Sequence, residues 1–131
     1  MPAVATPFLM FEGRASEAVD FYLRTLPDAK LVEMRTYGPG GPGPEGSVMK
    51  AVLSFAGQTV RCTDSVVKHG FSFTPAISFF LDCESAEQID QLFAKLSDGG
   101  GVLMPLGGYG FSRRFGWLND KFGVSWQLNL P

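Results

Sequence analysis

The sequence predicts an α+β fold made of two βαβββ modules in tandem, and three observations support this prediction. A short apolar stretch occurs twice, as TPFLMF from Thr6 and as TPAISF from Thr74, with starts 68 positions apart by direct count. A helical pattern of matching residues follows each copy, 70 positions apart. Two alternating stretches then end each half, and they correspond at an offset of 66 positions. The chain is therefore predicted to be a duplicated module with mixed sheets.

The length of 131 residues fits a single domain, which we expect to hold its two modules at about residues 1–66 and 67–131. Each module alone would be marginal in size, so we expect the two to share one core. The net charge is −2, with acidic and basic residues interspersed. This balance argues against nucleic acid and an anionic membrane as partners.

The two cysteines lie in apolar runs, and no CxxC pair or Cys/His cluster accompanies them. Cys62 and Cys83 are thus expected to be buried, reduced thiols, as in a cytosolic protein. No apolar run approaches the ~20 residues that a membrane span requires, and no signal-peptide pattern opens the sequence. We therefore expect a cytoplasmic protein.

The first module is predicted to contain a strand, a helix and three further strands. The helix should have Ala15, Ala18, Val19, Tyr22 and Leu26 as its apolar stripe, and Pro27 should end it. A turn at Ala56-Gly57 joins the last two strands as a hairpin. The expected ranges are strand Thr6–Glu12, helix Ser16–Leu26, strand Lys30–Tyr37, loop Gly38–Gly46 and hairpin strands Ser47–Phe55 and Gln58–Asp64.

The second module repeats this order. Its helix is the clearest prediction in the chain, because Ser85 and Gln88 form a capping box and Gly99 follows the last turn. The apolar stripe of this helix is Ile89, Leu92, Phe93 and Leu96. The strands are expected at Thr74–Asp82, Val102–Leu106, Ser112–Asn119 and Val124–Leu130.

A helix can cover only one face of each sheet, so each strand should have an apolar face and an uncovered face. In the offset of 66 positions, Val60 and Cys62 correspond to Trp126 and Leu128 on the covered face. The other residues expected on that face are Leu9, Phe11, Ile77, Phe79, Leu81 and Val124. Alternation also predicts that Met49, Ala51, Leu53 and Phe55 share one side of their strand.

The uncovered face mixes aromatic and polar side chains, which is the general make-up of a small-molecule pocket. A solvated sheet face is the alternative, and polar residues alone would favour it. Phe8, Met10 and Phe80 argue for the pocket, because solvent-facing strands seldom need such residues. The full set expected on this face is Phe8, Met10, Thr59, Arg61, Thr63, Thr74, Ser78, Phe80, Ser125, Gln127 and Asn129.

Two loop features each leave alternatives open. The segment Gly38–Gly46 (GPGGPGPEG) is expected to be a loop that is either an inert connection or a lid. The only histidine, His69, lies in a polar connection, where it is either simply solvated or in contact with a ligand.

Many stretches of the chain, in order, resemble one known family. They are TPFLMFEG, EAVDFY, GSVMKAVLSFAGQ, CTDS, HGFSFTPAISF, GGGVLMPL, YGFSRRFGWLNDKFG and VSWQLNL. These resemble the PhnB-like branch of the vicinal oxygen chelate superfamily, which includes the glyoxalase and bleomycin-resistance proteins. The branch is often labelled demethylubiquinone methyltransferase-like, and the resemblance covers nearly the whole chain.

The resemblance implies paired βαβββ modules that form a cup with the helices outside, and a site in each cup. Metal ligands of superfamily members would fall near Thr6 and Thr74, and at Arg61 and Gln127. Only Gln127 has a ligand-type side chain, and the charge of Arg61 would repel a divalent ion. We therefore predict no metal and no cofactor. No strand, glycine-rich turn and helix suited to S-adenosylmethionine occurs either, which argues against the methyltransferase label.

The favoured function is metal-independent binding of a small molecule, with the reaction unknown and enzymatic activity left open. One alternative is a metal-dependent lyase, isomerase or dioxygenase of glyoxalase type, which could use His69, Glu12 and Gln127. Another is a non-catalytic protein that sequesters a ligand, as in antibiotic resistance. The resemblance also implies a homodimer. No catalytic residue is assigned, and the candidate ligand-binding residues are Phe8, Met10, Thr59, Arg61, His69, Thr74, Ser78, Phe80, Trp117, Ser125 and Gln127.

Overall fold

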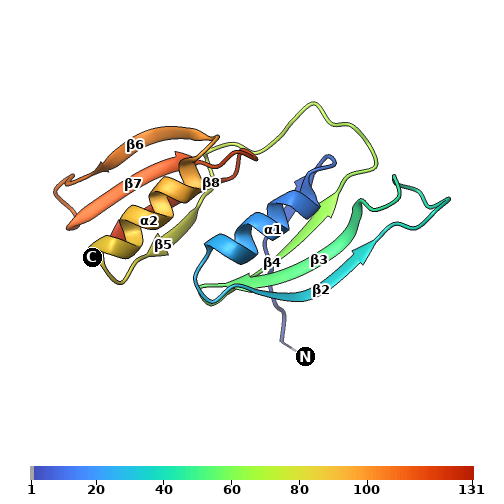
Figure 1. Cartoon of the computed structure of the whole chain (residues 1–131), viewed down its shortest axis with the longest axis horizontal. Coiled ribbons are helices and arrows are strands. Elements are labelled where there is room, and N and C mark those ends of the chain that lie inside the picture. The colour runs from blue at the N-terminus through green and yellow to red at the C-terminus, as the bar shows by residue number, and fades with distance from the viewer. Residues whose placement is uncertain (1) are drawn as a thin grey trace. The chain divides into compact units, whose positions relative to one another are not determined.

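The computed structural model describes residues 2–131, which divide into two compact units, the first ending at Gly70 and the second beginning at Phe71. Each unit consists of one strand, one helix and three further strands, and each contains a four-stranded sheet (Figure 1). The predicted α+β fold of two βαβββ modules in tandem is therefore confirmed. No helix within these residues is long and apolar enough to cross a membrane.

The first unit contains a mixed sheet with the strand order β1-β4-β3-β2. β1 pairs in parallel with β4, and the other two pairs are antiparallel. The elements are β1 (Phe8–Phe11), α1 (Ala15–Thr25), β2 (Lys30–Thr36), β3 (Val48–Phe55) and β4 (Gln58–Asp64).

The second unit repeats this topology with the strand order β5-β8-β7-β6, and β5 is parallel to β8. The elements are β5 (Phe79–Asp82), α2 (Ala86–Ser97), β6 (Gly101–Gly107), β7 (Arg114–Asn119) and β8 (Ser125–Leu130). Parallel pairing of the first and last strands is what the βαβββ connection allows, because the helix returns the chain to the same end of the sheet.

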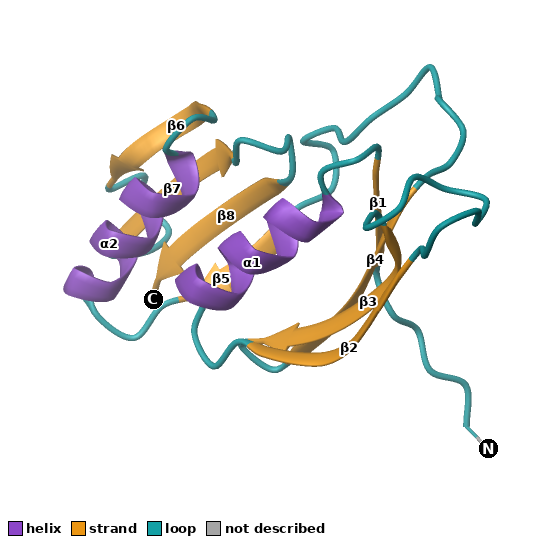
Figure 2. Ribbon diagram, turned by 45° about the vertical axis from the view of Figure 1, so that its right-hand side comes forward, coloured by secondary structure: helices purple, strands orange, loops and turns teal. Residues whose placement is uncertain are grey.

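Each helix lies against one face of the sheet in its own unit and leaves the other face without a helix (Figure 2). The predicted stripe of α1, with Val19 and Tyr22 at its centre, is buried against β3 and β4. The predicted stripe of α2, with Ile89 and Leu96 at its centre, is buried against β6, β7 and β8. The packing of α2 is close enough that a Cβ at Gly116 would collide with the ring of Phe93.

The two helices begin in different ways. Ser85 Oγ accepts the Gln88 N–H at 3.1 Å, and Gln88 Oε1 accepts the Glu84 N–H at 2.7 Å. The predicted capping box is thus present, although its second bond goes to Glu84 rather than to Ser85. Arg14 occupies the cap position of α1 and makes no capping hydrogen bond with its side chain.

The N-terminus of α1 is capped instead by a buried carboxylate from the end of β4. Asp64 Oδ1 accepts the backbone N–H groups of Gly13 and Ala15 at 2.8 and 2.9 Å. Asp64 Oδ2 accepts the Val48 N–H at 2.9 Å. One side chain therefore joins the helix, β3 and β4, and it satisfies donors that a helix start would leave unpaired.

The prediction for β5 was wrong at its start, because residues 71–78 form a loop and the strand begins at Phe79. Ile77, which was expected in the core, is 80% exposed. Without strand pairing at this position, the alternation rule does not fix the direction of its side chain. Phe79 and Leu81 keep their expected face, since Leu81 is buried and the Phe79 ring lies 4.9 Å from that of Trp126.

The prediction that Met49 lies on the same side of its strand as Ala51, Leu53 and Phe55 was also wrong. Val48 is fully buried and Met49 is exposed, whereas Ala51, Leu53 and Phe55 are buried as expected. The β2–β3 pairing is irregular between Arg35 and Thr36, opposite this stretch. An irregular register breaks strict alternation, so the first residues of β3 are out of phase with the rest.

The loop from Gly38 to Gly46 is closed at its base. The Tyr37 N–H donates to the Ser47 carbonyl, and the Gly46 N–H donates to the Tyr37 carbonyl, both at 2.9 Å. At Gly43 the backbone lies so close to the Tyr37 ring that a Cβ would be 2.7 Å from it. The loop therefore packs on the residue that directly precedes it.

Candidate functional site

The face of the second sheet opposite α2 brings several of the predicted site residues together. Phe80 and Trp117 both lie opposite Gln127 in the strand registers of β5–β8 and β7–β8. Directly paired residues point to the same side of a sheet, so all three side chains share the uncovered face. Phe80 is 56% exposed there. We call this surface the second open face.

A hydrogen-bonded cluster lies at this face. The Trp117 Nε1–H donates to Ser125 Oγ at 2.8 Å, and Ser125 Oγ is 2.6 Å from Ser78 Oγ. Gln127 Nε2 donates to Ser78 Oγ at 3.3 Å. Ser125 is buried, whereas the other three side chains are half-buried. We call these four residues the Ser78 cluster.

Aromatic rings that the sequence analysis did not select extend this face. Phe115 lies opposite Asn129, on the same side as Gln127, and is nevertheless buried. Its ring is 5.0 Å from Phe111, 6.0 Å from Tyr109 and 6.3 Å from Phe80, measured between centroids. The segment before β7 therefore folds over the face. Its pattern Tyr-Gly-Phe-Ser could have indicated this, since aromatics in a glycine loop seldom remain fully solvated.

The first sheet has a corresponding open face with different chemistry. Phe8 lies opposite Arg61 in the β1–β4 register, and both side chains are exposed. Within residues 2–131 the Arg61 guanidinium has no hydrogen bond or ion pair. Thr59 is exposed beside it on β4, and Met10 is half-buried on β1. This first open face therefore combines an apolar surface with one positive charge.

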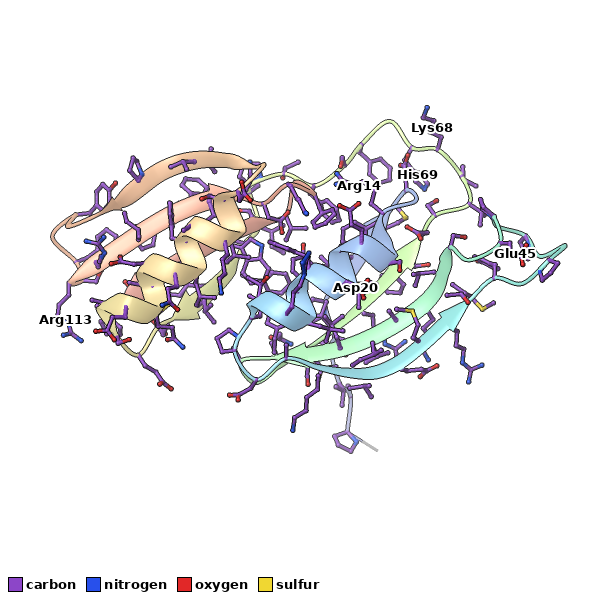
Figure 3. The ribbon with its side chains drawn as sticks, in the orientation of Figure 1. Arg14, Asp20, Glu45, Lys68, His69 and Arg113 are labelled. Carbon is purple, nitrogen blue, oxygen red and sulfur yellow. The ribbon has the colours of Figure 1, made fainter. Side chains whose placement is uncertain are left out.

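Two further predicted site residues lie in loops, as Ser78 does. Thr74 precedes β5, and its Oγ1 accepts only a long 3.4 Å bond from the Ala76 N–H. His69 lies on the segment after β4, next to Lys68 (Figure 3). Its Nε2 is 2.9 Å from Ser65 Oγ, and its backbone N–H donates to Glu12 Oε2 at 3.2 Å.

The places where metal ligands would fall hold few suitable donors. Thr6 and Thr74 lie outside the strands, and Arg61 is a cation. Gln127 uses its Nε2 for Ser78. Across residues 2–131, no three His, Cys, Asp or Glu side chains come together in a way that could hold a metal ion.

The two thiols are poor nucleophiles. Burial raises the pKa of Cys62 to about 12, and the nearby Asp64 carboxylate adds to this effect. Burial also raises the pKa of Cys83 to about 11. At neutral pH both groups are therefore protonated thiols, the unreactive form.

Comparison with known proteins identifies the family. The family model described as 3-demethylubiquinone-9 3-methyltransferase matches residues 3–129. The chain belongs to this family. YjdN of Escherichia coli K12 is 27% identical over 139 residues, with 95% of this chain and 93% of YjdN covered.

Solved structures place the 3-demethylubiquinone-9 3-methyltransferase family within a larger fold group. A Bacillus cereus protein, described as a PhnB protein and a candidate member of this family, is 50% identical, with a TM-score of 0.94 over 98% of this chain and all of that chain. A glyoxylase/bleomycin resistance protein/dioxygenase domain from Frankia sp. EAN1pec is 15% identical, with a TM-score of 0.67 over 99% and 98% of the two chains. The predicted PhnB-like branch and vicinal oxygen chelate fold are thus confirmed.

Proposed function

We propose that this protein binds a small organic molecule on the second open face without using a metal ion. The observation that carries the proposal is the Ser78 cluster beside the exposed ring of Phe80. A preformed set of hydrogen-bonding groups next to an aromatic surface is typical of small-molecule sites. The Trp117 indole, held through Ser125, would form part of the same contact surface.

The donor set supports binding without a metal. A divalent ion requires several oxygen, nitrogen or sulfur ligands around one point, and residues 2–131 gather no such group of His, Cys, Asp or Glu. His69 and Glu12, which the metal-dependent alternative would use, contact each other through the His69 backbone N–H. The His69 Nε2 atom lies 2.9 Å from Ser65 Oγ.

The first open face would serve anionic or carbonyl-bearing ligands. The planar guanidinium of Arg61 can donate two parallel hydrogen bonds to a carboxylate or phosphate. Phe8 at the paired position provides an apolar surface beside it. Thr59 could add a hydroxyl from the same strand.

The intrinsic fluorescence of the protein offers a direct test, because its two tryptophans have different surroundings. Trp117 is half-buried at the proposed site, whereas Trp126 is fully buried and donates from Nε1 to Asp120 Oδ2 at 2.9 Å. We expect compounds that bind the second open face to change the emission of the wild-type protein. The Trp117→Phe variant should lose that change, while a Phe8→Ala variant on the other sheet should keep it.

If no flat organic compound in a screen changes the emission of Trp117, the proposed site is wrong. The same conclusion follows if the compounds change the emission equally in wild type and in the Gln127→Ala variant. The metal question is tested separately. Protein purified without chelator should contain no stoichiometric metal, and Ni, Mn, Fe, Zn or Co should not raise its melting temperature. Stoichiometric metal would instead support glyoxalase-type chemistry.

We also propose a cytoplasmic homodimer. Two buried free thiols are consistent with a reducing compartment. The edge strands β2 and β6 expose apolar side chains, namely Leu31, Val32, Val102 and Leu103, which a second copy could cover. Light scattering after size exclusion should give twice the mass of 14.2 kDa. A monomeric mass would remove this part of the proposal.

A further inference from the structure

The hydrogens of the Ser78 cluster can be assigned from the connectivity of its bonds. The indole N–H of Trp117 can only donate, so Ser125 Oγ is an acceptor in that bond. Ser125 is 2% exposed, and its hydroxyl hydrogen has Ser78 Oγ as the available acceptor within residues 2–131. The opposite direction would leave a buried hydroxyl hydrogen without an acceptor, which is costly. Ser125 therefore donates to Ser78.

This direction determines what Ser78 can offer to another molecule. Ser78 Oγ accepts from Ser125 and from Gln127 Nε2, and these two bonds use both of its lone pairs. Its own hydrogen then has no acceptor among the described residues. Ser78 is half-buried, so this hydroxyl hydrogen is accessible from the open face.

Gln127 presents the complementary group at the neighbouring position. Its Nε2 is engaged with Ser78, and its Oε1 has no hydrogen-bond partner within residues 2–131. Gln127 is also half-buried and lies opposite the exposed Phe80 in the β5–β8 register. The face thus offers one donor, one adjacent acceptor and an aromatic surface.

We infer that the ligand carries a carbonyl oxygen next to an N–H or O–H group on a flat, uncharged body, as in a lactam or an amide. The carbonyl oxygen accepts from the Ser78 hydroxyl, and the N–H or O–H donates to Gln127 Oε1. The flat body lies on Phe80. This inference rests on the proposed function and adds the chemical class of the ligand.

A pair of ring compounds tests the inference. 2-Quinolone has a carbonyl next to a ring N–H, whereas 1-methyl-2-quinolone keeps the carbonyl and lacks the N–H. Binding is measured by ¹H–¹⁵N NMR from the shift of the Trp117 indole signal, which the Trp117→Phe variant assigns. We expect 2-quinolone to bind about tenfold more tightly than its methyl derivative, the size of one good hydrogen bond.

Variants separate the two hydrogen bonds. Ser78→Ala should lower the affinity for 2-quinolone by about tenfold, whereas Ser78→Thr, which keeps the hydroxyl, should retain most of that affinity. Gln127→Glu should also weaken it, because a carboxylate would take the Ser78 hydrogen. Ser97→Ala is the matched control, since this serine lies on α2 and donates to the Phe93 carbonyl on the covered side of the sheet.

The outcomes distinguish this inference from the function on which it rests. Equal affinity for the two compounds, or full affinity in Ser78→Ala with an unchanged melting temperature, would overturn the ligand class and leave the binding site standing. If neither compound shifts the Trp117 signal, the ligand class and the proposed site fail together. Tighter binding of 2-quinolone that is lost in Ser78→Ala but kept in Ser97→Ala supports both.

Discussion

The helix of the second module is capped by its immediate neighbour, whereas the helix of the first is capped by a residue almost fifty positions downstream. Ser85 precedes α2 directly and caps it with its own side chain. The start of α1 is capped instead by Asp64, the last residue of β4, which is the final strand of the first module. At the offset of 66 positions between the two modules, Asp64 corresponds to Leu130 of β8, which is buried and apolar.

The difference shows how one architecture can meet the same requirement in two ways. A helix start leaves backbone N–H groups that need acceptors. Where a local serine supplies one, the end of the last strand is available for a core leucine. Where no local cap exists, that strand end carries a buried carboxylate. The first module therefore depends more strongly on a contact between residues distant in sequence.

The largest expected effect is the loss of the distant cap. Asp64→Ala would leave three backbone N–H groups, those of Gly13, Ala15 and Val48, without their acceptor. We expect the free energy of unfolding to fall by about 3 kcal/mol or more. Urea denaturation measures this, and Asp64→Asn, which keeps a carbonyl oxygen, should lose less. An effect no larger than that of an exposed aspartate such as Asp20 would contradict the assignment.

The buried thiols of the two modules should make the folded protein less stable as the pH rises above 9. The pKa of Cys62 is raised from about 9 to about 12, and that of Cys83 to about 11. Above pH 9 the unfolded chain releases these protons while the folded chain keeps them, so stability falls as pH rises towards 12. We expect Cys62→Ala to remove on the order of 2 kcal/mol of this fall. Cys83→Ala should remove less, and identical pH profiles for wild type and both variants would argue against buried thiols.

The local cap should matter less than the distant one. Ser85→Ala removes a single capping bond and should cost about 1 kcal/mol. Denaturation of this variant beside Asp64→Ala gives the comparison directly. Ser85→Asp, which can still cap, serves as the control and should be close to wild type. A larger loss for Ser85→Ala than for Asp64→Ala would reverse our reading of the two modules.

Much of the fold could be predicted because its determinants are local. The stripe of α2 and its capping box lie within a dozen residues, so periodicity and one motif were sufficient to identify them. The Asp64 cap could not be predicted, since a carboxylate at a strand end does not indicate which amides it meets. The burial of Val48 and the exposure of Met49 could not be predicted for a related reason. The irregular β2–β3 register depends on the partner strand, so alternation within β3 alone does not show it.

The candidate site shows the same division. Strand alternation correctly placed Phe80 and Gln127 on one face, since a regular register fixes direction. It did not fix the direction of Trp117, which the register of β7 and β8 brings to the same face. The contact between Ser78 and Ser125 joins residues 47 positions apart, and the pattern gave no sign of their bond. Phe111 and Tyr109 were missed because a glycine-containing loop has no periodicity from which a direction could be inferred.

The smallest expected effect concerns the two hairpin turns. In the first module, Ala56 and Gly57 both have positive φ values, 46° and 82°. In the second, Asp120 accepts the Phe122 and Val124 N–H groups at 2.9 and 3.1 Å and so stabilises a longer turn. Asn tolerates positive φ better than Ala, so Ala56→Asn should raise the free energy of unfolding by about 0.5 kcal/mol. The melting temperature should rise slightly as a result. Calorimetry measures this, and a lower melting temperature would be the contrary result.

The loop from Gly38 to Gly46 has its ends fixed by the bonds between Tyr37, Gly46 and Ser47. The β2–β3 hairpin is thus already closed before the tip of the loop begins. Lengthening such a tip is inexpensive, since each doubling of loop length costs only about 0.6 kcal/mol in closure entropy. Related chains could therefore vary this segment in length without disturbing the sheet. It is also the place where a reporter peptide could be inserted with the fold intact.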